Sequence, residues 1–313
     1  MQRPELSLIL NQVENAHAYG RRETLNTPKE PKARHRQKPP DGRSVSTVDL
    51  KRSPLRWAGS KQKLLPLLRE HVPENYKRYV EPFCGSLALF VAIKPKSALV
   101  GDLNEELINF YKMVRWRPRH VHRLTMSLTE NGADYYNIRQ LDPSSLAADL
   151  RAARFLYLNR HCFNGVYRTN RRGFFNVPRG KHVGSLPDSE ELIAFSKLIR
   201  NAEIKAGDFA ELLTQVRADD FVYLDPPYAG RGVRDRGEYG PSSFRADDID
   251  RLYDAVTQAS DKGAKILLSY ADLPIIRSRF SSWDITTIEV ARNVSGFAKD
   301  RGTARELLLK NYD

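Results

Sequence analysis

Apolar and polar positions follow two different periods along the chain. Short apolar runs are typical of buried strands. The first such run begins at Tyr79, and later runs predict strands at 98–102, 221–224, 264–270, 285–291 and 306–312. Between them, apolar residues recur every three or four positions, as in the helices predicted at 245–262 and 274–280. Strands that alternate with helices predict an α/β fold with a doubly wound sheet.

Two regions depart from this alternation. Residues 112–205 begin as a mainly helical stretch, so we predict a module inserted into a domain made of 53–111 and 206–313. Residues 1–52 contain one short apolar patch and are then rich in Lys, Arg, Pro, Gln and Ser. Such a segment buries too little apolar surface to offset its ordering entropy, so we expect a disordered basic arm. This arm either adds phosphate contacts or is a passive extension.

The charge balance favours a polyanionic partner. The 313 residues include 51 Lys and Arg against 38 Asp and Glu, which gives a net charge of +13 and an isoelectric point near 9.7. Cys84 and Cys162 form no disulfide framework and no zinc-ligand cluster surrounds them. No apolar run reaches about 18 residues and no secretory leader is apparent, so we expect a cytoplasmic protein without a membrane span.

The strand at 221–224 ends in Asp225-Pro226-Pro227-Tyr228. The two prolines supply no N–H and fix φ near about −65°, and the residue before a proline is itself held extended. Asp225 therefore stands at the carboxyl end of a strand, where ligands bind in open α/β sheets. Its carboxylate and the Pro226 carbonyl can each accept one N–H of an exocyclic amine, while Tyr228 stacks on the attached ring. The alternative is an ordinary turn with a solvated aspartate.

Three other turns carry candidate ligand-binding residues. Trp57 and Lys61 flank a glycine-containing turn and could hold an aromatic ring and a carboxylate, although a core position for Trp57 is the commoner case. The strand–turn–helix at 81–85 is a place where a nucleotide-like ligand approaches the backbone closely. It is neither a dinucleotide fingerprint nor a P-loop, and its acidic residue suits a positive centre better than phosphates. Asp102, about 20 residues on, is placed to accept ribose hydroxyls.

Residues 151–187 contain no acidic residue. Basic, amide and aromatic side chains are interleaved there, as a nucleic-acid groove requires. Cations neutralise phosphates, Arg and Asn read base edges, and an aromatic ring can wedge into the base stack. A charge run is usually a solvated face, but the interleaved aromatics favour nucleic-acid contact. The candidate side chains are Arg160, His161, Phe163, Asn164, Tyr167, Arg168, Asn170, Arg171, Arg172, Phe174, Asn176, Arg179, Lys181 and His182.

Together, these motifs resemble the Dam family of N6-adenine-specific DNA methyltransferases, the D12 class with the α order of motifs. The matching stretches, in family order, are 56–61, 81–85, 102–105, 158–168, 175–178 and 225–228. The resemblance covers about residues 53–313, and residues 1–52 have no counterpart in the compact family members. The glycine turn of the family, which corresponds to Gly85-Ser86-Leu87 here, is usually Gly-x-Gly. Leu87 therefore holds the position of the second glycine.

The resemblance implies a Rossmann-like methyltransferase domain, made of 53–111 and 206–313, with a DNA-recognition domain at 112–205. It implies S-adenosylmethionine as the methyl donor and no metal. The implied cofactor-binding residues are Trp57, Lys61, Glu81, Phe83, Gly85, Asp102 and Asp225. The implied catalytic residues are Asp225, Pro226, Pro227 and Tyr228. The implied DNA-binding residues, centred on a hairpin at about 159–182, are Arg160, Phe163, Asn164, Val166, Arg168, Asn170, Arg171 and Pro178.

The implied reaction is direct methyl transfer to an adenine flipped out of double-stranded DNA, at GATC or another GA-containing site. By similarity, Arg168 donates to a guanine, Phe163 wedges beside the target, and Lys61 pairs with the carboxylate of the methyl donor. We expect a monomer in the cytoplasm of a prokaryotic or phage-infected cell.

Three alternatives stay open. A cytosine-N4 methyltransferase usually carries Ser at the position of Asp225, and a glutamine methyltransferase of release factors usually carries Asn there and lacks the basic insert. A catalytically weak or inactive DNA-binding regulator on the same scaffold is the third, motivated by Leu87.

Overall fold

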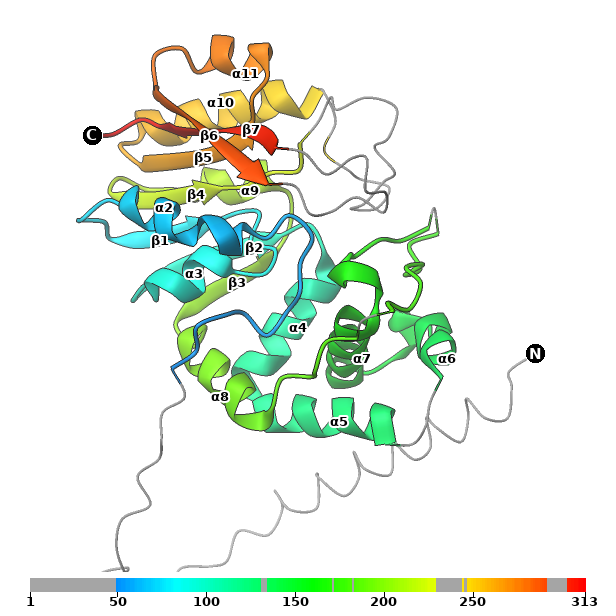
Figure 1. Ribbon diagram of the computed structural model, residues 1–313. Coiled ribbons are helices and arrows are strands. Elements are labelled where there is room, and N and C mark those ends of the chain that lie inside the picture. Colours follow the sequence, from blue (N-terminus) through cyan, green and yellow to red (C-terminus); the bar gives the residue numbers. More distant parts are fainter. Residues whose placement is uncertain are drawn as a thin grey trace, which may run out of the picture.

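One mixed sheet organises the part of the chain that the computed structural model describes, which is residues 49–130, 134–170, 172–181, 183–228, 244, 247–291 and 303–313. Its seven strands lie in the order β3-β2-β1-β4-β5-β7-β6 (Figure 1). The strands are β1 Arg78–Glu81, β2 Ala98–Asp102, β3 Ala202–Ala206, β4 Asp220–Leu224, β5 Lys265–Ala271, β6 Asp284–Ala291 and β7 Thr303–Lys310.

The strand order reverses once, between β1 and β4. From β3 to β5 neighbouring strands are parallel, and β7 pairs antiparallel with both β5 and β6. Val80 is in register with Leu99 on one side and Val222 on the other. In such a sheet the connections leave the reversal point on opposite faces, so a crevice opens at the carboxyl ends of the strands. The prediction of a doubly wound, Rossmann-like α/β fold is confirmed.

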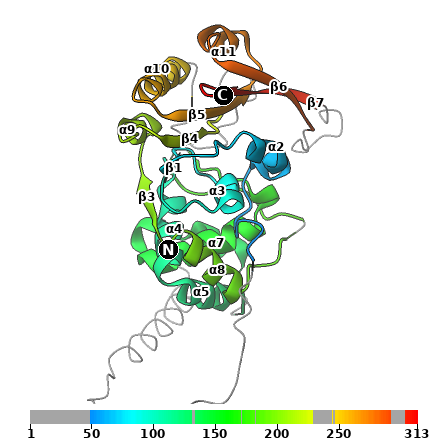
Figure 2. The same ribbon diagram turned by 90° about the vertical axis from the view of Figure 1, so that its left-hand side faces the viewer.

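Both faces of the sheet are covered by helices. Alternate side chains of β4 enter two different cores, with Phe221 and Tyr223 in one and Val222 and Leu224 in the other. Burial on both sides explains why the strands appear in the sequence as continuous apolar runs. Helices α9 and α10 lie across the sheet from α2 and α3 (Figure 2). The helices packed on the sheet are α2 Leu65–Glu70, α3 Ala88–Ile93, α4 Glu105–Trp116, α9 Phe209–Thr214, α10 Asp247–Asp261 and α11 Pro274–Arg279.

A second group of helices lies beside the sheet, against α4 (Figure 1). Its members are α5 Pro118–Glu130, α6 Tyr135–Gln140, α7 Ala148–His161 and α8 Ser189–Leu198. This group has a small core of its own, which includes Leu124, Tyr157 and Phe175. Between α7 and α8 the chain forms a hairpin, with antiparallel bridges between Cys162 and Arg179 and between Thr169 and Phe175.

The structure places some residues differently from the boundaries that the sequence suggested. Strand β3 pairs with β2 throughout, so residues 202–205, assigned above to the inserted module, lie in the sheet. Helix α4 runs across the other boundary, at 111 and 112, as one uninterrupted element. Leu50, assigned above to the basic arm, is 8% exposed and packs in the core beside Leu55. Residues 1–48 lie outside the described residues.

Candidate active site

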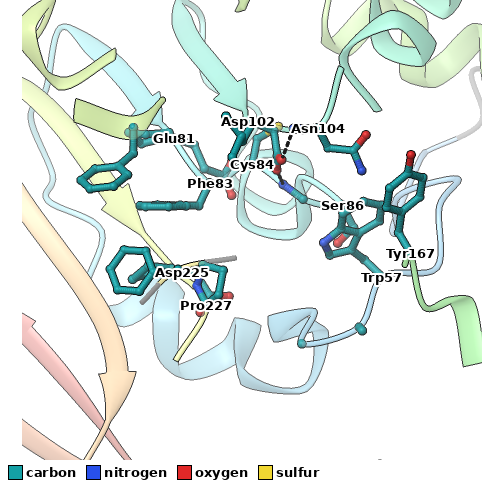
Figure 3. A pocket seen from close by; sticks show the side chains of 18 of the residues that line it. Trp57, Glu81, Phe83, Cys84, Ser86, Asp102, Asn104, Tyr167, Asp225 and Pro227 are labelled. Carbon is teal, nitrogen blue, oxygen red and sulfur yellow. Dashed lines mark hydrogen bonds between the residues drawn. The ribbon is translucent and has the colours of Figure 1, made fainter. Parts of the chain in front are cut away.

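A cavity of about 1050 Å³ opens at the carboxyl ends of β1, β2, β3 and β4, where the strand order reverses. The turns that follow these strands form its floor, and Tyr167 and Thr169 of the hairpin form part of its wall. Figure 3 shows Trp57 and Tyr167 on one side of the cavity and Phe83 and Asp225 on the other. All residues predicted to bind the cofactor, and all those predicted to be catalytic, line this cavity.

The turn after β1 depends on left-handed backbone at two positions. Gly85 has φ +42°, and a Cβ added there would lie 2.9 Å from the Trp57 ring. Leu87 has φ 58° and precedes the first residue of α3. The left-handed conformation at Leu87 explains why the family that the motifs resemble usually has glycine at this position. The Leu87 side chain is fully buried in the core of the sheet and does not line the cavity.

Asp102 connects the β1 turn to α4. Its Oδ2 accepts the Gly85 N–H at 3.1 Å, and its Oδ1 accepts the Asn104 N–H at 3.0 Å. Asn104 in turn caps α4, because its side chain accepts the N–H groups of Glu106 and Leu107. Burial raises the pKa of Asp102 to about 6, although the two backbone donors act in the opposite direction. The carboxylate keeps lone pairs for a ligand that donates hydrogen bonds.

Glu81 is a buried acid with an open acceptor. The residue is 3% exposed, and its Oε2 accepts no hydrogen bond from the described residues. Burial raises its pKa well above the usual value, the neighbouring Tyr79 hydroxyl opposes this rise, and the Asp225 and Asp102 carboxylates add to it. A buried acceptor without a partner costs free energy, and a cationic donor in the cavity would remove that cost.

Asp225 follows β4 and carries an ion pair. The Lys61 ammonium donates to Asp225 Oδ1 at 2.6 Å and to the Tyr228 hydroxyl at 3.1 Å. Ser269 of β5 donates to the same Oδ1 at 3.4 Å. The Tyr228 ring is tilted against Tyr270, with 5.1 Å between the ring centres. Burial raises the pKa of Asp225, and the positive charge of Lys61 opposes that rise.

Lys61 lies between two carboxylates of the chain. Its ammonium contacts Asp225 and lies 3.8 Å from Glu306 Oε2. The pairing of Lys61 with the carboxylate of a bound methyl donor stays a prediction. Burial alone lowers the pKa of Lys61, but the neighbouring Asp225 charge and the other acidic groups raise it overall. Lys61 is therefore a buried cation held between two carboxylates.

The cavity wall joins the sheet to the hairpin. The Trp57 and Tyr167 rings stack with 6.2 Å between their centres and 18° between their planes. Asn159 of α7 holds the preceding residue, because its Oδ1 accepts the Arg56 N–H at 2.9 Å and its Nδ2 donates to the Arg56 carbonyl at 2.6 Å. Gly165 lies so close that an added Cβ would be 2.4 Å from Arg56 Cβ.

The residues predicted to contact DNA fall into four groups. Phe163, Asn164 and Pro178 are exposed, and Asn164 has a left-handed φ of 52°. Val166 and Arg168 are half-buried, and the Arg168 Nε donates to Asn176 Oδ1 at 2.8 Å. Arg160 and Asn170 form hydrogen bonds within the chain. Arg171 lies outside the described residues.

Arg160 and Asn170 hold neighbouring backbone segments in place. The Arg160 guanidinium donates to the carbonyls of Pro54 and Ser185. Asn170 Oδ1 accepts the N–H groups of Arg172 and Phe174, which closes the tip of the hairpin. Both side chains therefore have a structural partner wherever the DNA lies.

Sequence reasoning missed four cavity or neighbouring residues. Asp208 and Phe209 follow β3 and line the cavity, and Phe209 stacks on Phe83 with 5.1 Å between the ring centres. The signal for them was Gly207-Asp208 after a short alternating run, the same strand-then-acid pattern as at Asp102. Ser269 and Glu306 reach Asp225 and Lys61 from β5 and β7. No local motif marks these two, because they meet the site through strand pairing.

Within the described residues, no helix is long and apolar enough to cross a membrane. Across the same residues, no group of three or more His, Cys, Asp or Glu side chains is arranged to hold a metal ion.

Comparison with known proteins assigns the family. Residues 57–294 match the profile of the D12 class N6 adenine-specific DNA methyltransferase family. The chain is 33% identical over 267 residues to the type II methyltransferase M1.LlaDCHI of Lactococcus lactis subsp. cremoris, covering 82% of this chain and 94% of that protein. It is 30% identical over 261 residues to the DNA adenine methylase of Escherichia coli K12, covering 81% and 93%. This chain therefore belongs to the D12 class of N6 adenine-specific DNA methyltransferases.

Proposed function

We propose that the protein transfers a methyl group from S-adenosylmethionine directly to the N6 amino group of an adenine flipped out of duplex DNA, at GATC or another GA-containing site. Family membership implies the methyl donor and the DNA substrate. The observation that carries the rest is the placement of Asp225 and Tyr228 at the end of β4, on the wall of an acidic cavity.

The cavity residues fit S-adenosylmethionine, which supplies a methyl group bonded to a positively charged sulfur. Glu81 presents a buried acceptor oxygen that suits an ammonium group. Asp102 would accept the ribose hydroxyls, at the carboxyl end of β2. Trp57 presents an aromatic ring fixed by its stack on Tyr167. The excess of carboxylates in the cavity also favours a ligand with positive charge.

The second half of the site suits the target base. Asp225 and the Pro226 carbonyl accept the two N–H groups of the adenine amine, and Tyr228 stacks on the ring. These contacts turn the nitrogen lone pair toward the methyl group. Positioning of this kind, rather than a strong base, supplies most of the acceleration. Flipping the base out of the stack costs a few kcal/mol, which contacts to the DNA offset.

The hairpin supports recognition of DNA at this place. Tyr167 and Thr169 line the cavity, while Phe163 is 43% exposed at the start of the same hairpin. Residues 151–187 contain eight Lys and Arg and no acid. We assign Phe163 to a wedge beside the target and Arg168 to a guanine contact in the major groove. Leu87, which motivated an inactive regulator as the alternative, takes no space from the cavity.

The test is methylation of duplex DNA by the purified protein with S-adenosylmethionine, read as N6-methyladenine in digested nucleosides and mapped along the sequence. Asp225→Ala should lower turnover by at least about a hundredfold, the order for a positioned catalytic group. Its DNA affinity should stay largely intact, because Asp225 faces the amine rather than phosphates. Asp261→Ala, an exposed aspartate at the end of α10, is the matched control. Wild-type protein that produces no N6-methyladenine contradicts the proposal.

A further inference from the structure

The Lys61 ammonium lies where the proposed function places the adenine amine. Its Nζ is 2.6 Å from Asp225 Oδ1 and 5.2 Å from the centre of the Tyr228 ring. The hydrogen bonds that described residues donate to Asp225 come from Lys61 and Ser269, and both reach Oδ1. Two donors, the ammonium and the target amine, are thus assigned to one carboxylate and one aromatic surface. Movement of Lys61 away from Oδ1 would free this oxygen for the amine.

Lys61 cannot release Asp225 at low cost, either by losing its charge or by moving to solvent. Its side chain is 9% exposed, so the ammonium lies inside the protein. Deprotonation is opposed, because the acidic neighbours stabilise the charged form more than burial destabilises it. A buried cation that leaves one anion requires another within reach.

Glu306 is the second anion. Its Oε2 lies 3.8 Å from Lys61 Nζ, and this buried oxygen accepts no hydrogen bond from the described residues. Glu306 stands on β7 opposite Ala271 of β5, so strand pairing fixes it next to the strand that carries Ser269. A shift of about 1 Å would bring the ammonium within hydrogen-bond distance of Oε2.

We infer that Glu306 is a positioning residue for adenine capture, which takes over the Lys61 ammonium while the amine of the target adenine bonds to Asp225. The inference rests on the proposed function, because it concerns the amine that Asp225 receives. With either partner the group of two carboxylates and one ammonium keeps the same net charge. The exchange therefore replaces one ion pair by another and satisfies the open oxygen of Glu306.

The inference is tested by binding, without methyl transfer. The target site is taken from the methylation map, and duplexes carry either adenine or unsubstituted purine, which lacks the amine, at the target position. Dissociation constants for both duplexes are measured for wild type and Glu306→Gln in the absence of S-adenosylmethionine. The substitution preserves size and removes the charge. We expect the ratio of the two constants to shift by about tenfold against adenine, the order of one hydrogen bond to a charged group.

Two further variants separate this role from a structural one. Glu289→Gln makes the same change at an exposed position of the neighbouring β6, and we expect it to leave the ratio unchanged. In a Lys61→Met background the competing cation is absent, so Glu306→Gln should have no further effect on the ratio. Thermal unfolding confirms that each variant is folded.

Two outcomes overturn the inference. One is an unchanged ratio in folded Glu306→Gln, and the other is an equal shift with and without Lys61. Both differ from failure of the proposed function, in which the wild-type protein produces no N6-methyladenine at any site.

Discussion

At the scale of single residues, Asp102 is a cavity carboxyl whose pKa differs from that of an exposed aspartate. Burial raises its pKa to about 6, so in the folded protein it binds a proton at pH values where an exposed aspartate is charged. The neutral form is favoured by folding, and this contribution to stability is lost as pH rises from about 4 to about 6. In the proposed function, ribose hydroxyls donate to the charged form. Folding and ligand binding therefore favour opposite protonation states of this carboxyl.

The first prediction follows from that opposition. S-adenosylmethionine affinity should fall as pH decreases below about 6, and binding near that pH should release protons. Calorimetry in buffers of different ionisation enthalpy measures both effects. Asp102→Asn should bind more weakly at pH 7 and lose part of the pH dependence, so the difference between the two proteins isolates this carboxyl. Identical pH profiles for wild type and Asp102→Asn would exclude Asp102 from the ligand site.

The second prediction concerns Gly85, where the backbone and the Trp57 ring are in close contact. Gly85→Ala combines a positive φ with a Cβ only 2.9 Å from the ring, so the ring has to move. The backbone cost is about 1–2 kcal/mol of unfolding free energy. Gly263→Ala carries a similar backbone cost, at φ +87°, but its Cβ would meet Ala218 only at 3.6 Å.

Denaturant unfolding and ligand titration distinguish the two glycines. Both variants should lose stability, whereas S-adenosylmethionine affinity should fall only for Gly85→Ala. Unchanged affinity in Gly85→Ala would mean that the position of Trp57 does not matter for binding.

At the scale of elements, the hairpin after α7 combines side chains that face the cavity with side chains that face outward. Its stem is joined by the bridge between Thr169 and Phe175 and by the hydrogen bond from Arg168 to Asn176. That hydrogen bond uses the Arg168 Nε, and among the described residues no partner is seen for the two terminal nitrogens. The guanidinium is therefore oriented by one nitrogen and can donate with the others to a guanine.

The third prediction is that Arg168→Ala relaxes preference at one guanine of the recognition site, while the other positions stay discriminated. A bidentate arginine contact is worth about 1–3 kcal/mol of discrimination. Asn176→Ala should cause a smaller change at the same position, because it releases the Nε that orients Arg168. Methylation mapped on random-sequence DNA measures both. A uniform loss across all sequences would instead show that Arg168 contacts phosphate.

The same scale shows what the sequence could predict. Strand β4 and its Asp-Pro-Pro-Tyr turn were predictable, because a continuous apolar run and two prolines act locally. The edge strand β3 was not, since only Ala202 and Ile204 of its five residues face a core. The role of Glu306 could not be predicted from the sequence for another reason. Its place beside Lys61 depends on pairing between β7 and β5, which no local pattern encodes.

At the scale of the whole molecule, the sheet and the helical group build the site together. The Trp57–Tyr167 stack and the two hydrogen bonds between Asn159 and Arg56 cross from one to the other. A change in the hairpin on DNA binding therefore acts directly on the wall of the cavity. This contact provides a physical route by which recognition of the site and binding of the methyl donor can be coupled.

Charge is distributed unequally over the chain. Residues 1–48 contain nine Lys and Arg and five Asp and Glu, a net charge of +4. Taking these from the 51 basic and 38 acidic residues of the whole chain leaves 42 and 33, so residues 49–313 carry +9. The larger share of the net positive charge thus belongs to residues 49–313, which also contain the hairpin. The first 48 residues can add to affinity but contain none of the residues assigned to base reading.

The last prediction is that deletion of residues 1–48 weakens DNA binding without changing the recognition site. For duplex DNA, every phosphate that a protein neutralises steepens the dependence of log affinity on log salt concentration by about 0.9, so the slope should become shallower without this basic segment. The deletion keeps Leu50, which is part of the core, and thermal unfolding checks that the shortened protein is folded. Binding measured at several salt concentrations gives the slope, and methylation mapping gives the site. An unchanged slope would identify the segment as a passive extension, and a different set of methylated sites would show that it takes part in reading the sequence.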